Sequence, residues 1–65
     1  MEKYVIKKDG FTDFYIRKAY YGVRNEYEWQ YLAHTYNNGD ERWEKLPQSE
    51  DAILNYLHKY GEKVS

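Results

Sequence analysis

The 65-residue sequence lacks cysteine, contains one proline and is poor in aliphatic residues. Without cysteine, neither disulfide bonds nor a Cys-based zinc site can stabilise so short a chain, so its core must consist of packed side chains alone. No apolar run approaches the ~20 residues of a membrane-spanning helix, and no long apolar leader opens the sequence. We therefore expect a cytoplasmic protein that folds as one small domain over residues 1–65.

Tyrosine takes the place of the missing aliphatic residues. Aromatic residues make up 20% of the sequence, and nine of them are tyrosines. Because a tyrosine ring can pack while its hydroxyl stays in water, tyrosines can line a shallow core without burying unpaired donors. Tyrosine is also enriched at protein interfaces and stacks on nucleobases, so some of the nine are candidates for a recognition surface.

The charges are balanced in total but not along the chain. Ten basic and eleven acidic residues leave a net charge of −1. A domain whose affinity rests on phosphate contacts is normally strongly basic, so this balance argues against nucleic acid as the main partner. Residues 1–24 are nevertheless net basic and residues 25–51 net acidic, and the acidic middle suits a basic surface on a partner.

Pro47 divides the chain into a part with strand signals and a part with a helix signal. Before it, β-branched and aromatic runs and one clear alternation predict strands at about residues 3–8, 11–20, 26–36 and 41–46. Hairpin signals, Asp9-Gly10 and Asn38-Gly39, separate the first two strands and the last two.

Both hairpins are expected to have three-residue loops, at residues 8–10 and 37–39, that end in a glycine in the left-handed conformation. A two-residue loop in the second hairpin would turn Trp43 to the polar face, because a slip of one residue moves every side chain to the other side. The pairs predicted on this basis are Tyr4 with Phe14, Ile6 with Thr12, Ala33 with Trp43 and His34 with Arg42.

After Pro47, the sequence predicts a helix over about residues 50–60. Ser49 is the expected N-cap, and Gly61 is expected to end the helix in the left-handed conformation. An apolar stripe at helical spacing needs a partner surface, which the aromatic face of the sheet supplies; it consists of Ile53, Tyr56, Leu57 and Tyr60.

These elements predict an α+β fold: an antiparallel β-meander of four strands, or three to four, with one C-terminal helix packed on one face. The register assigns five tyrosines to the seam between sheet and helix, namely Tyr4, Tyr27, Tyr31, Tyr56 and Tyr60. Of the adjacent Tyr20 and Tyr21, we expect one to be buried and one exposed, with Tyr21 outside.

The residue sets that support catalysis or metal binding are missing from the pattern. No serine or threonine stands beside a predicted base and orienting carboxylate, and His34 and His58 lack metal-ligand spacing. Glu26 and Glu28 share a strand face, but one helix on one side of a sheet leaves no deep cleft for paired carboxylates. We expect neither enzymatic activity nor a cofactor nor a metal.

Two surfaces are therefore candidates for binding. One is the sheet face opposite the helix, which is predicted to include Arg42, Glu44 and Leu46. The other is the connection at residues 20–25, where tyrosine and arginine, the residue types of binding hot spots, occur together. The sequence leaves open which of the two binds. The candidate partner-binding residues are Tyr15, Arg17, Tyr21, Arg24, Glu26, Glu28, Leu32 and Tyr36.

The opening strand, Tyr4-Val5-Ile6-Lys7-Lys8-Asp9-Gly10, the further hairpins and a terminal helix opening with Ser49-Glu50-Asp51-Ala52 resemble small accessory proteins of phages and prophages of low-GC bacteria. That resemblance implies a modulator or inhibitor of a protein partner, including nucleic-acid-processing or defence complexes. The order of sheet and helix is also similar to the arm-site DNA-binding domain of tyrosine integrases. It implies nucleic-acid binding as the alternative, although Glu26, Glu28 and Glu44 on the predicted face would repel a phosphate backbone. We expect a monomer or a weakly self-associating protein.

Overall fold

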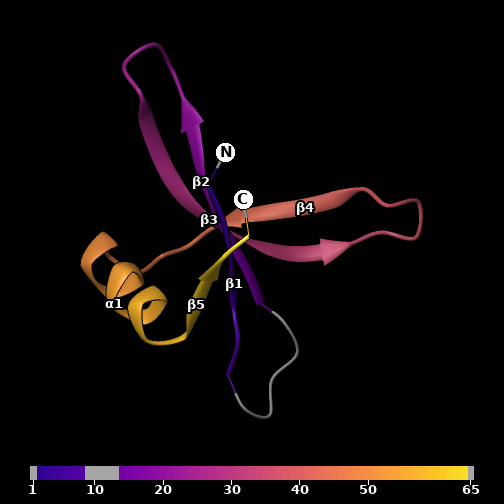
Figure 1. Cartoon of the computed structure of the whole chain (residues 1–65). Helices are drawn as coiled ribbons and strands as arrows, with labels where there is room; N and C mark the ends of the chain where they lie inside the picture. The colour runs from indigo at the N-terminus through magenta and orange to yellow at the C-terminus, as the bar shows by residue number, and fades with distance from the viewer. Residues whose placement is uncertain (1, 9–13, 65) are drawn as a thin grey trace.

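The computed structural model describes residues 2–8 and 14–64, and these form a single antiparallel sheet with one helix. The order of the strands in the sheet is β4-β3-β2-β1-β5, so β1 to β4 form the predicted meander (Figure 1). A short fifth strand, which was not predicted, follows the helix and adds to β1. The elements are β1 (Lys3–Ile6), β2 (Phe14–Tyr21), β3 (Glu26–Thr35), β4 (Glu41–Lys45), α1 (Glu50–Tyr60) and β5 (Gly61–Lys63).

The register of β1 on β2 differs from the prediction by two residues. Tyr4 pairs with Ile16 rather than with Phe14, and Phe14 pairs with Ile6. This register brings apolar side chains opposite each other, which stabilises an antiparallel pair. Because the shift is an even number of residues, each side chain keeps its predicted face. The predicted loop positions Asp9 and Gly10 lie outside the described residues.

The turn between β3 and β4 is the predicted three-residue loop. Tyr36 donates its backbone N–H to the carbonyl of Asp40 at 2.7 Å, and Gly39 donates to the carbonyl of Tyr36 at 2.9 Å. Gly39 has a φ of 92°, in the left-handed region. His34 faces Arg42, as predicted.

A β-bulge at Ala33 then changes the register. Beyond it, Trp43 pairs with Leu32 and not with Ala33. An extra residue in one strand turns every following side chain of its partner to the opposite face. The predicted placement of Trp43 on the helix-covered face, beside Trp29, is therefore wrong. For the same reason Glu44, which pairs with Tyr31, lies on the helix-covered side.

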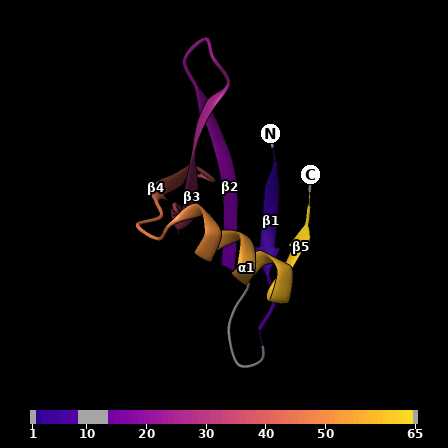
Figure 2. The same ribbon diagram turned by 90° about the vertical axis from the view of Figure 1, so that its left-hand side faces the viewer.

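The core is small and lies between the sheet and α1. Four buried residues, Ile6, Ile16, Trp29 and Ile53, form its centre. Figure 2 shows α1 lying across β2 and β1, where Ile53 reaches the sheet. Packed around this centre are five half-buried residues, Tyr4, Tyr27, Tyr31, Leu46 and Leu57. Three of the five tyrosines assigned to the seam are therefore in place, and Leu46 lies on the helix side rather than on the opposite face.

Two tyrosines of the helix stripe, Tyr56 and Tyr60, remain at the edge of this core. Each side chain is 37% exposed, and the two rings contact each other with centroids 5.0 Å apart. Tyr56 lines an apolar groove of about 420 Å³ between α1 and the sheet, together with Phe14, which is 40% exposed. The helix is too short to cover the whole aromatic face, so the seam stays partly open.

The helix begins and ends at the predicted residues, but its C-terminus has another geometry. The Oγ of Ser49 accepts a hydrogen bond from the N–H of Ala52, as an N-cap does. Gly61 has φ −87° and ψ 149°, so it is extended and not left-handed. It is the first residue of β5, and its N–H still donates to the carbonyl of Leu57. The prediction of a left-handed cap is wrong because the chain turns directly into a strand.

Close packing of backbone explains the glycine at position 61. A Cβ there would lie 2.7 Å from the carbonyl oxygen and 2.9 Å from the Cα of Leu57. We expect Gly61→Ala to lower the free energy of unfolding by about 2 kcal/mol or more, because backbone atoms cannot move aside as a side chain can. Urea titration checks this. Gly39→Ala, where a Cβ would meet nothing within 4 Å, should cost only the ~1 kcal/mol of a strained φ. Equal losses in both variants would contradict the close approach.

The bulge also predicts unequal roles for the two tryptophans. Trp29 is buried in the core, whereas Trp43 is half-buried on the helix-free face. We expect Trp29→Ala to cost about 3–5 kcal/mol and to unfold a domain of this size, and Trp43→Ala to cost about 1–2 kcal/mol and leave it folded. Thermal unfolding followed by circular dichroism separates the two. Unfolding by both substitutions would place both rings in one core, as the unbulged register requires.

Candidate protein-binding surface

The turn end of the β2–β3 hairpin, residues 19–28, projects beyond the rest of the sheet. We call this two-stranded projection the finger. The last pair between β1 and β2 is Lys3 with Arg17, and the last between β3 and β4 is Gln30 with Lys45. From Ala19 onward, β2 and β3 therefore pair only with each other. Figure 1 shows this finger projecting away from the helix, while the β3–β4 hairpin leaves the sheet in another direction.

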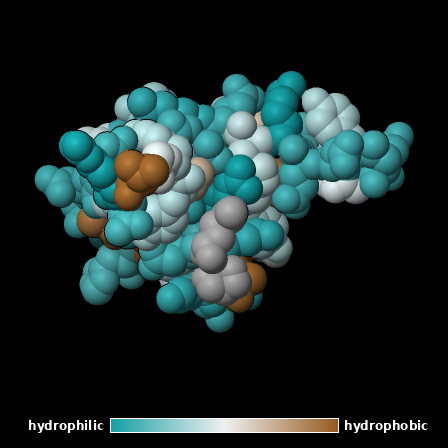
Figure 3. Space-filling view, turned by 90° about the horizontal axis from the view of Figure 1, so that it is seen from above, coloured by the Kyte–Doolittle hydropathy of each residue, from teal (hydrophilic) through white to brown (hydrophobic). Residues whose placement is uncertain are grey.

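The end of the finger is a four-residue loop with two residues in the left-handed region. Gly22 has a φ of 70° and Asn25 a φ of 58°. Asparagine is among the few residues besides glycine that adopt this conformation readily. Between them, Val23 is 99% exposed. Viewed from above, a mostly hydrophilic surface carries a small hydrophobic patch where the finger points at the viewer (Figure 3).

Tyr20 and Tyr21 are both exposed, by 50% and 53%. The expectation that one of them is buried is wrong, because the finger leaves the helix behind and neither of its faces is covered. Tyr20 lies on the helix side, where its ring contacts that of Tyr27 with centroids 5.6 Å apart. Tyr21 pairs with Glu26 and lies on the other side. Of these two tyrosines, Tyr20 alone has a ring contact with another aromatic side chain of the described residues.

A network around Glu2 fixes the base of the finger. Its carboxylate accepts hydrogen bonds from the hydroxyls of Tyr4 at 3.3 Å and Tyr20 at 3.1 Å, and it pairs with the ammonium of Lys18 at 3.4 Å. The same ammonium lies over the ring of Tyr27, 4.4 Å from its centroid. Glu2, which precedes β1, thus contacts β2 of the finger directly and is linked to β3 through Lys18.

A second tether joins the finger to the helix. The hydroxyl of Tyr27 donates a hydrogen bond of 2.6 Å to the carboxylate of Glu50, in the first turn of α1. This hydrogen bond, together with desolvation, raises the pKa of Tyr27. In the Glu2 network, the hydrogen bond from Tyr20 and the hydrogen bond and charge of Lys18 lower the pKa of Glu2, against the opposing effect of desolvation. The lowered pKa favours the charged form of Glu2.

The helix-free face carries an ordered layer of cations and aromatic rings. The guanidinium of Arg17 lies 4.2 Å from the ring centroid of Trp43 and donates from Nε to the side-chain oxygen of Gln30 at 2.9 Å. Gln30 in turn donates to the carboxylate of Glu28 at 2.9 Å. Lys3 lies over the ring of Tyr15 at 5.3 Å. This chain of contacts fixes the orientation of the polar side chains on this face.

The predicted binding residues divide among three places. Tyr15, Arg17, Glu28 and Leu32 share the helix-free face, and Tyr21, Arg24 and Glu26 belong to the finger, so these seven adjoin one another. Tyr36 lies apart, at the end of the β3–β4 hairpin, with its side chain 44% exposed. The sequence analysis missed Trp43 and Lys45 on this face and placed Arg42 there instead. No local sequence signal marks the bulge at Ala33, which places Trp43 and Lys45 on this face and Arg42 on the other.

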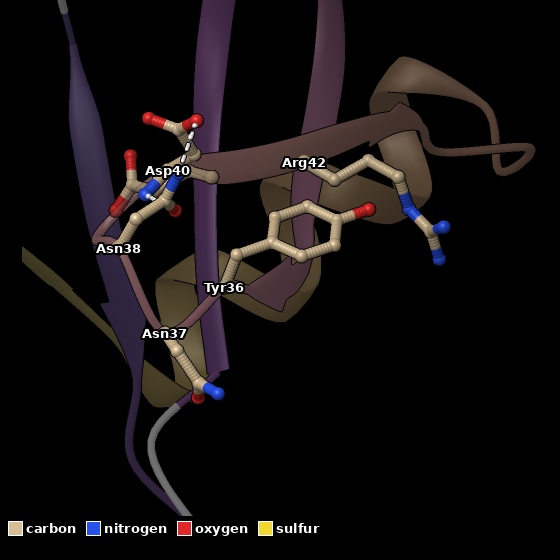
Figure 4. Close-up of a pocket in the computed structure, with 6 residues that line it drawn as sticks. Tyr36, Asn37, Asn38, Asp40 and Arg42 are labelled. Carbon is tan, nitrogen blue, oxygen red and sulfur yellow. Dashed lines mark hydrogen bonds between the residues drawn. The ribbon is translucent and has the colours of Figure 1, made fainter.

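The end of the β3–β4 hairpin forms an open hollow of about 800 Å³ (Figure 4). The amide of Asn38 donates to the carboxylate of Asp40 at 3.0 Å, and its side-chain oxygen accepts the N–H of Asp40 at 3.0 Å. Arg42 pairs with Glu44 at 3.4 Å. These polar groups are used in shaping the turn itself, so the hollow offers no convergent set for a ligand.

Among residues 2–8 and 14–64, the structure holds no group of three or more His, Asp or Glu side chains suited to a metal ion, and no helix long and apolar enough to cross a membrane. One buried polar atom of this part of the chain, Nε1 of Trp29, has no hydrogen-bond partner. Comparisons of the chain with protein-family models, with curated proteins and with solved structures found no match.

Acid should loosen the base of the finger. The pKa of Glu2 lies below its ordinary value of 4.5, so its ionised form stabilises the fold fully above that value, and this contribution is lost as the pH falls through the lowered pKa. We expect the free energy of unfolding to fall below about pH 4.5, and Glu2→Gln to flatten this fall. Urea titrations over this pH range measure it.

Glu26→Gln is the matched control, because that exposed carboxylate has no hydrogen-bond or ion-pair partner in the described part of the chain. It should leave the acid dependence unchanged. If the free energy of unfolding falls equally steeply at acid pH in the wild type and in Glu2→Gln, the Glu2 network has no role in this dependence.

Proposed function

We propose that this chain is a non-enzymatic binding protein of the phage or mobile-element accessory type, acting in the cytoplasm, which engages a protein partner through the end of its finger. Binding modulates or inhibits that partner, and a nucleic-acid-processing or defence complex is the class that the sequence resemblance supports. The observation that carries the proposal is the projecting finger end, where a fully exposed Val23 stands next to Arg24 and an exposed Tyr21.

The chemistry of the finger end supports binding. An apolar side chain that is 99% exposed gains the most when a partner removes it from water, about 1.5–3 kcal/mol for complete burial of a valine-sized group. Tyrosine and arginine are the residue types that dominate binding energy at protein interfaces. The charges at this end are mixed, with Arg24 near Glu26, which favours a protein surface over a polyanion.

The construction of the finger supports binding as well. Its strands pair along residues 19–28, its base is tied to Glu2, and its ring pair is tied to the helix through Glu50. A loop that is already ordered loses little conformational entropy when it binds. A narrow ribbon that protrudes from a small domain fits a concave site on a larger partner.

Substitution of the finger end tests the proposal. We expect the double variant Val23→Asp with Arg24→Ala to lose at least ~tenfold in affinity, because it removes an apolar contact and a hot-spot residue without touching the core. Tagged protein is used to capture partners from a lysate of its source cells, and the partner identified is then purified and titrated directly against wild type and variant.

The matched control is Tyr36→Ala with Arg42→Ala, which removes an aromatic residue and an arginine from the other hairpin end. This control should bind the purified partner like the wild type. If the finger variant is folded by circular dichroism and still binds with wild-type affinity, the assignment of the finger end is wrong. Loss of binding only in the control would move the site to the β3–β4 hairpin.

A further inference from the structure

The outer edge of β4 has no neighbouring strand among the described residues. β4 (Glu41–Lys45) is the last strand in the order of the sheet, so β3 is its one partner there. Figure 1 shows the β3–β4 hairpin projecting away from α1. A strand edge of this kind is a template on which a further strand can pair.

The backbone of β4 points its hydrogen-bonding groups alternately toward β3 and away from it. The N–H of Leu46 donates to a carbonyl of β3 at 2.9 Å, and the carbonyl of Asp40 accepts the N–H of the residue that follows β3 at 2.7 Å. Residues at even positions therefore face β3. Three residues present their N–H and C=O groups to the open edge: Glu41, Trp43 and Lys45.

The charged side chains of β4 are arranged with opposite signs on either side of Trp43. On the helix-free face, Trp43 stands between Glu41, which accepts a hydrogen bond from its Nε1 at 3.2 Å, and Lys45. On the helix side, Arg42 pairs with Glu44 at 3.4 Å. All four charged residues are exposed. Reading β4 outward from Trp43, each charge on one side has its opposite at the same distance on the other.

This order complements itself in an antiparallel pair. A two-fold axis at Trp43 places Glu41 opposite Lys45 of a second copy. It places Arg42 opposite Glu44 of that copy, and it sets the two half-buried indoles side by side on the helix-free face. The outward-facing residues then meet outward-facing residues, so each such pair exchanges two backbone hydrogen bonds. We propose that β4 pairs with β4 of a second copy of this chain, which joins two sheets into one across a two-fold axis.

The neighbouring registers are unfavourable. A shift by two residues in one direction puts Arg42 opposite Arg42 of the second copy, and in the other direction it puts Glu44 opposite Glu44. A shift by one residue sets an outward-facing residue against one that faces β3, which breaks the backbone hydrogen bonds. Charged side chains on an edge strand usually prevent pairing. Here they oppose the neighbouring registers and favour the one centred on Trp43.

The opposite edge of the sheet is a poorer partner for β4. β5 (Gly61–Lys63) has three residues, and the N–H of Gly61 already donates to the carbonyl of Leu57. Pairing of β4 with β5 would also continue from copy to copy, whereas pairing of β4 with itself closes at two. The dimer goes beyond the proposed function, because the finger end at residues 22–25 lies outside β4.

Positions 41 and 45 test the pairing, because their side chains meet only between two copies. Four residues along a strand separate them by about 13 Å within one copy. We expect Lys45→Glu to raise the dimer dissociation constant at least ~tenfold, because a glutamate then faces Glu41 at both ends of the pair. Adding Glu41→Lys to the same chain should restore the dimer. Sedimentation over a concentration series measures this, and the wild type should approach twice its mass of 8.0 kDa.

The matched control is Lys45→Glu with Glu26→Lys, which has the same net charge as the restoring variant but carries the new lysine on the finger, at an exposed position. It should dimerise as weakly as Lys45→Glu alone. If it restores the dimer as well as Glu41→Lys does, net charge and not strand pairing governs association, and the proposal is wrong.

A single cysteine at the axis gives a second measurement that does not depend on charge. The chain has no cysteine of its own. A hydrogen-bonded antiparallel pair holds its Cα atoms about 5.5 Å apart, which is within the range of a disulfide. Trp43→Cys should therefore form a disulfide-linked dimer under mild oxidation. Val23→Cys, at a position that is 99% exposed, should form little, and equal yields would contradict the pairing.

A wild type that stays monomeric at millimolar concentration overturns the proposal. A series of masses that grows beyond the dimer also overturns it, because it would indicate open-ended pairing of β4 with β5. The Val23→Asp, Arg24→Ala variant should dimerise like the wild type, so failure of the dimer and failure of the finger assignment are distinguishable.

Discussion

The shortage of aliphatic side chains governs how this domain is held together. Only five hydrophobic residues among those described are buried, so the sheet cannot rely on a deep core. Tyrosines extend the packing, and the hydroxyls of Tyr4, Tyr20 and Tyr27 donate hydrogen bonds to carboxylates. Tyr20 and Tyr27 are tied by those hydroxyls to Glu2 and Glu50, which joins the N-terminus, the finger and the helix. A polar network at the edge of the core thus contributes to the stability that larger domains obtain from burial of apolar side chains.

A single extra residue decides the chemistry of the open face. The bulge at Ala33 turns Trp43 away from the core, and Arg17 stacks on it. It also brings Lys45 into line with Arg17 and removes Glu44 to the helix side. With a regular register, the face would have carried Glu44 and no indole. The alignment of Lys45 with Gln30 and Arg17 and the stacking of Arg17 on Trp43 are consequences of the bulge, although neither involves Ala33 directly.

The sequence predicted what depends on local chemistry. Turn residues, the cap at Ser49 and the helix stripe identified the helix, the meander and the second turn. Prediction from the sequence failed where tertiary contacts override local preference. The position of Gly61 predicts a left-handed helix cap, but a glycine is required there because a Cβ would collide with the backbone of Leu57. The β1–β2 register is chosen by cross-strand packing of Ile6 and Phe14, and nothing local distinguishes it from a pairing two residues away. The candidate site was predicted residue by residue on β2 and β3 but not on β4, beyond the bulge.

Finger and face have different physical requirements, which separates their roles. The finger end needs rigidity in a segment with no core, and the left-handed Gly22 and Asn25, with tethers at the base, supply it. The face needs no such support, because the sheet beneath it is continuous over five strands. The two surfaces therefore differ in what holds them in place, which is a set of tethers for the finger and the neighbouring strands for the face.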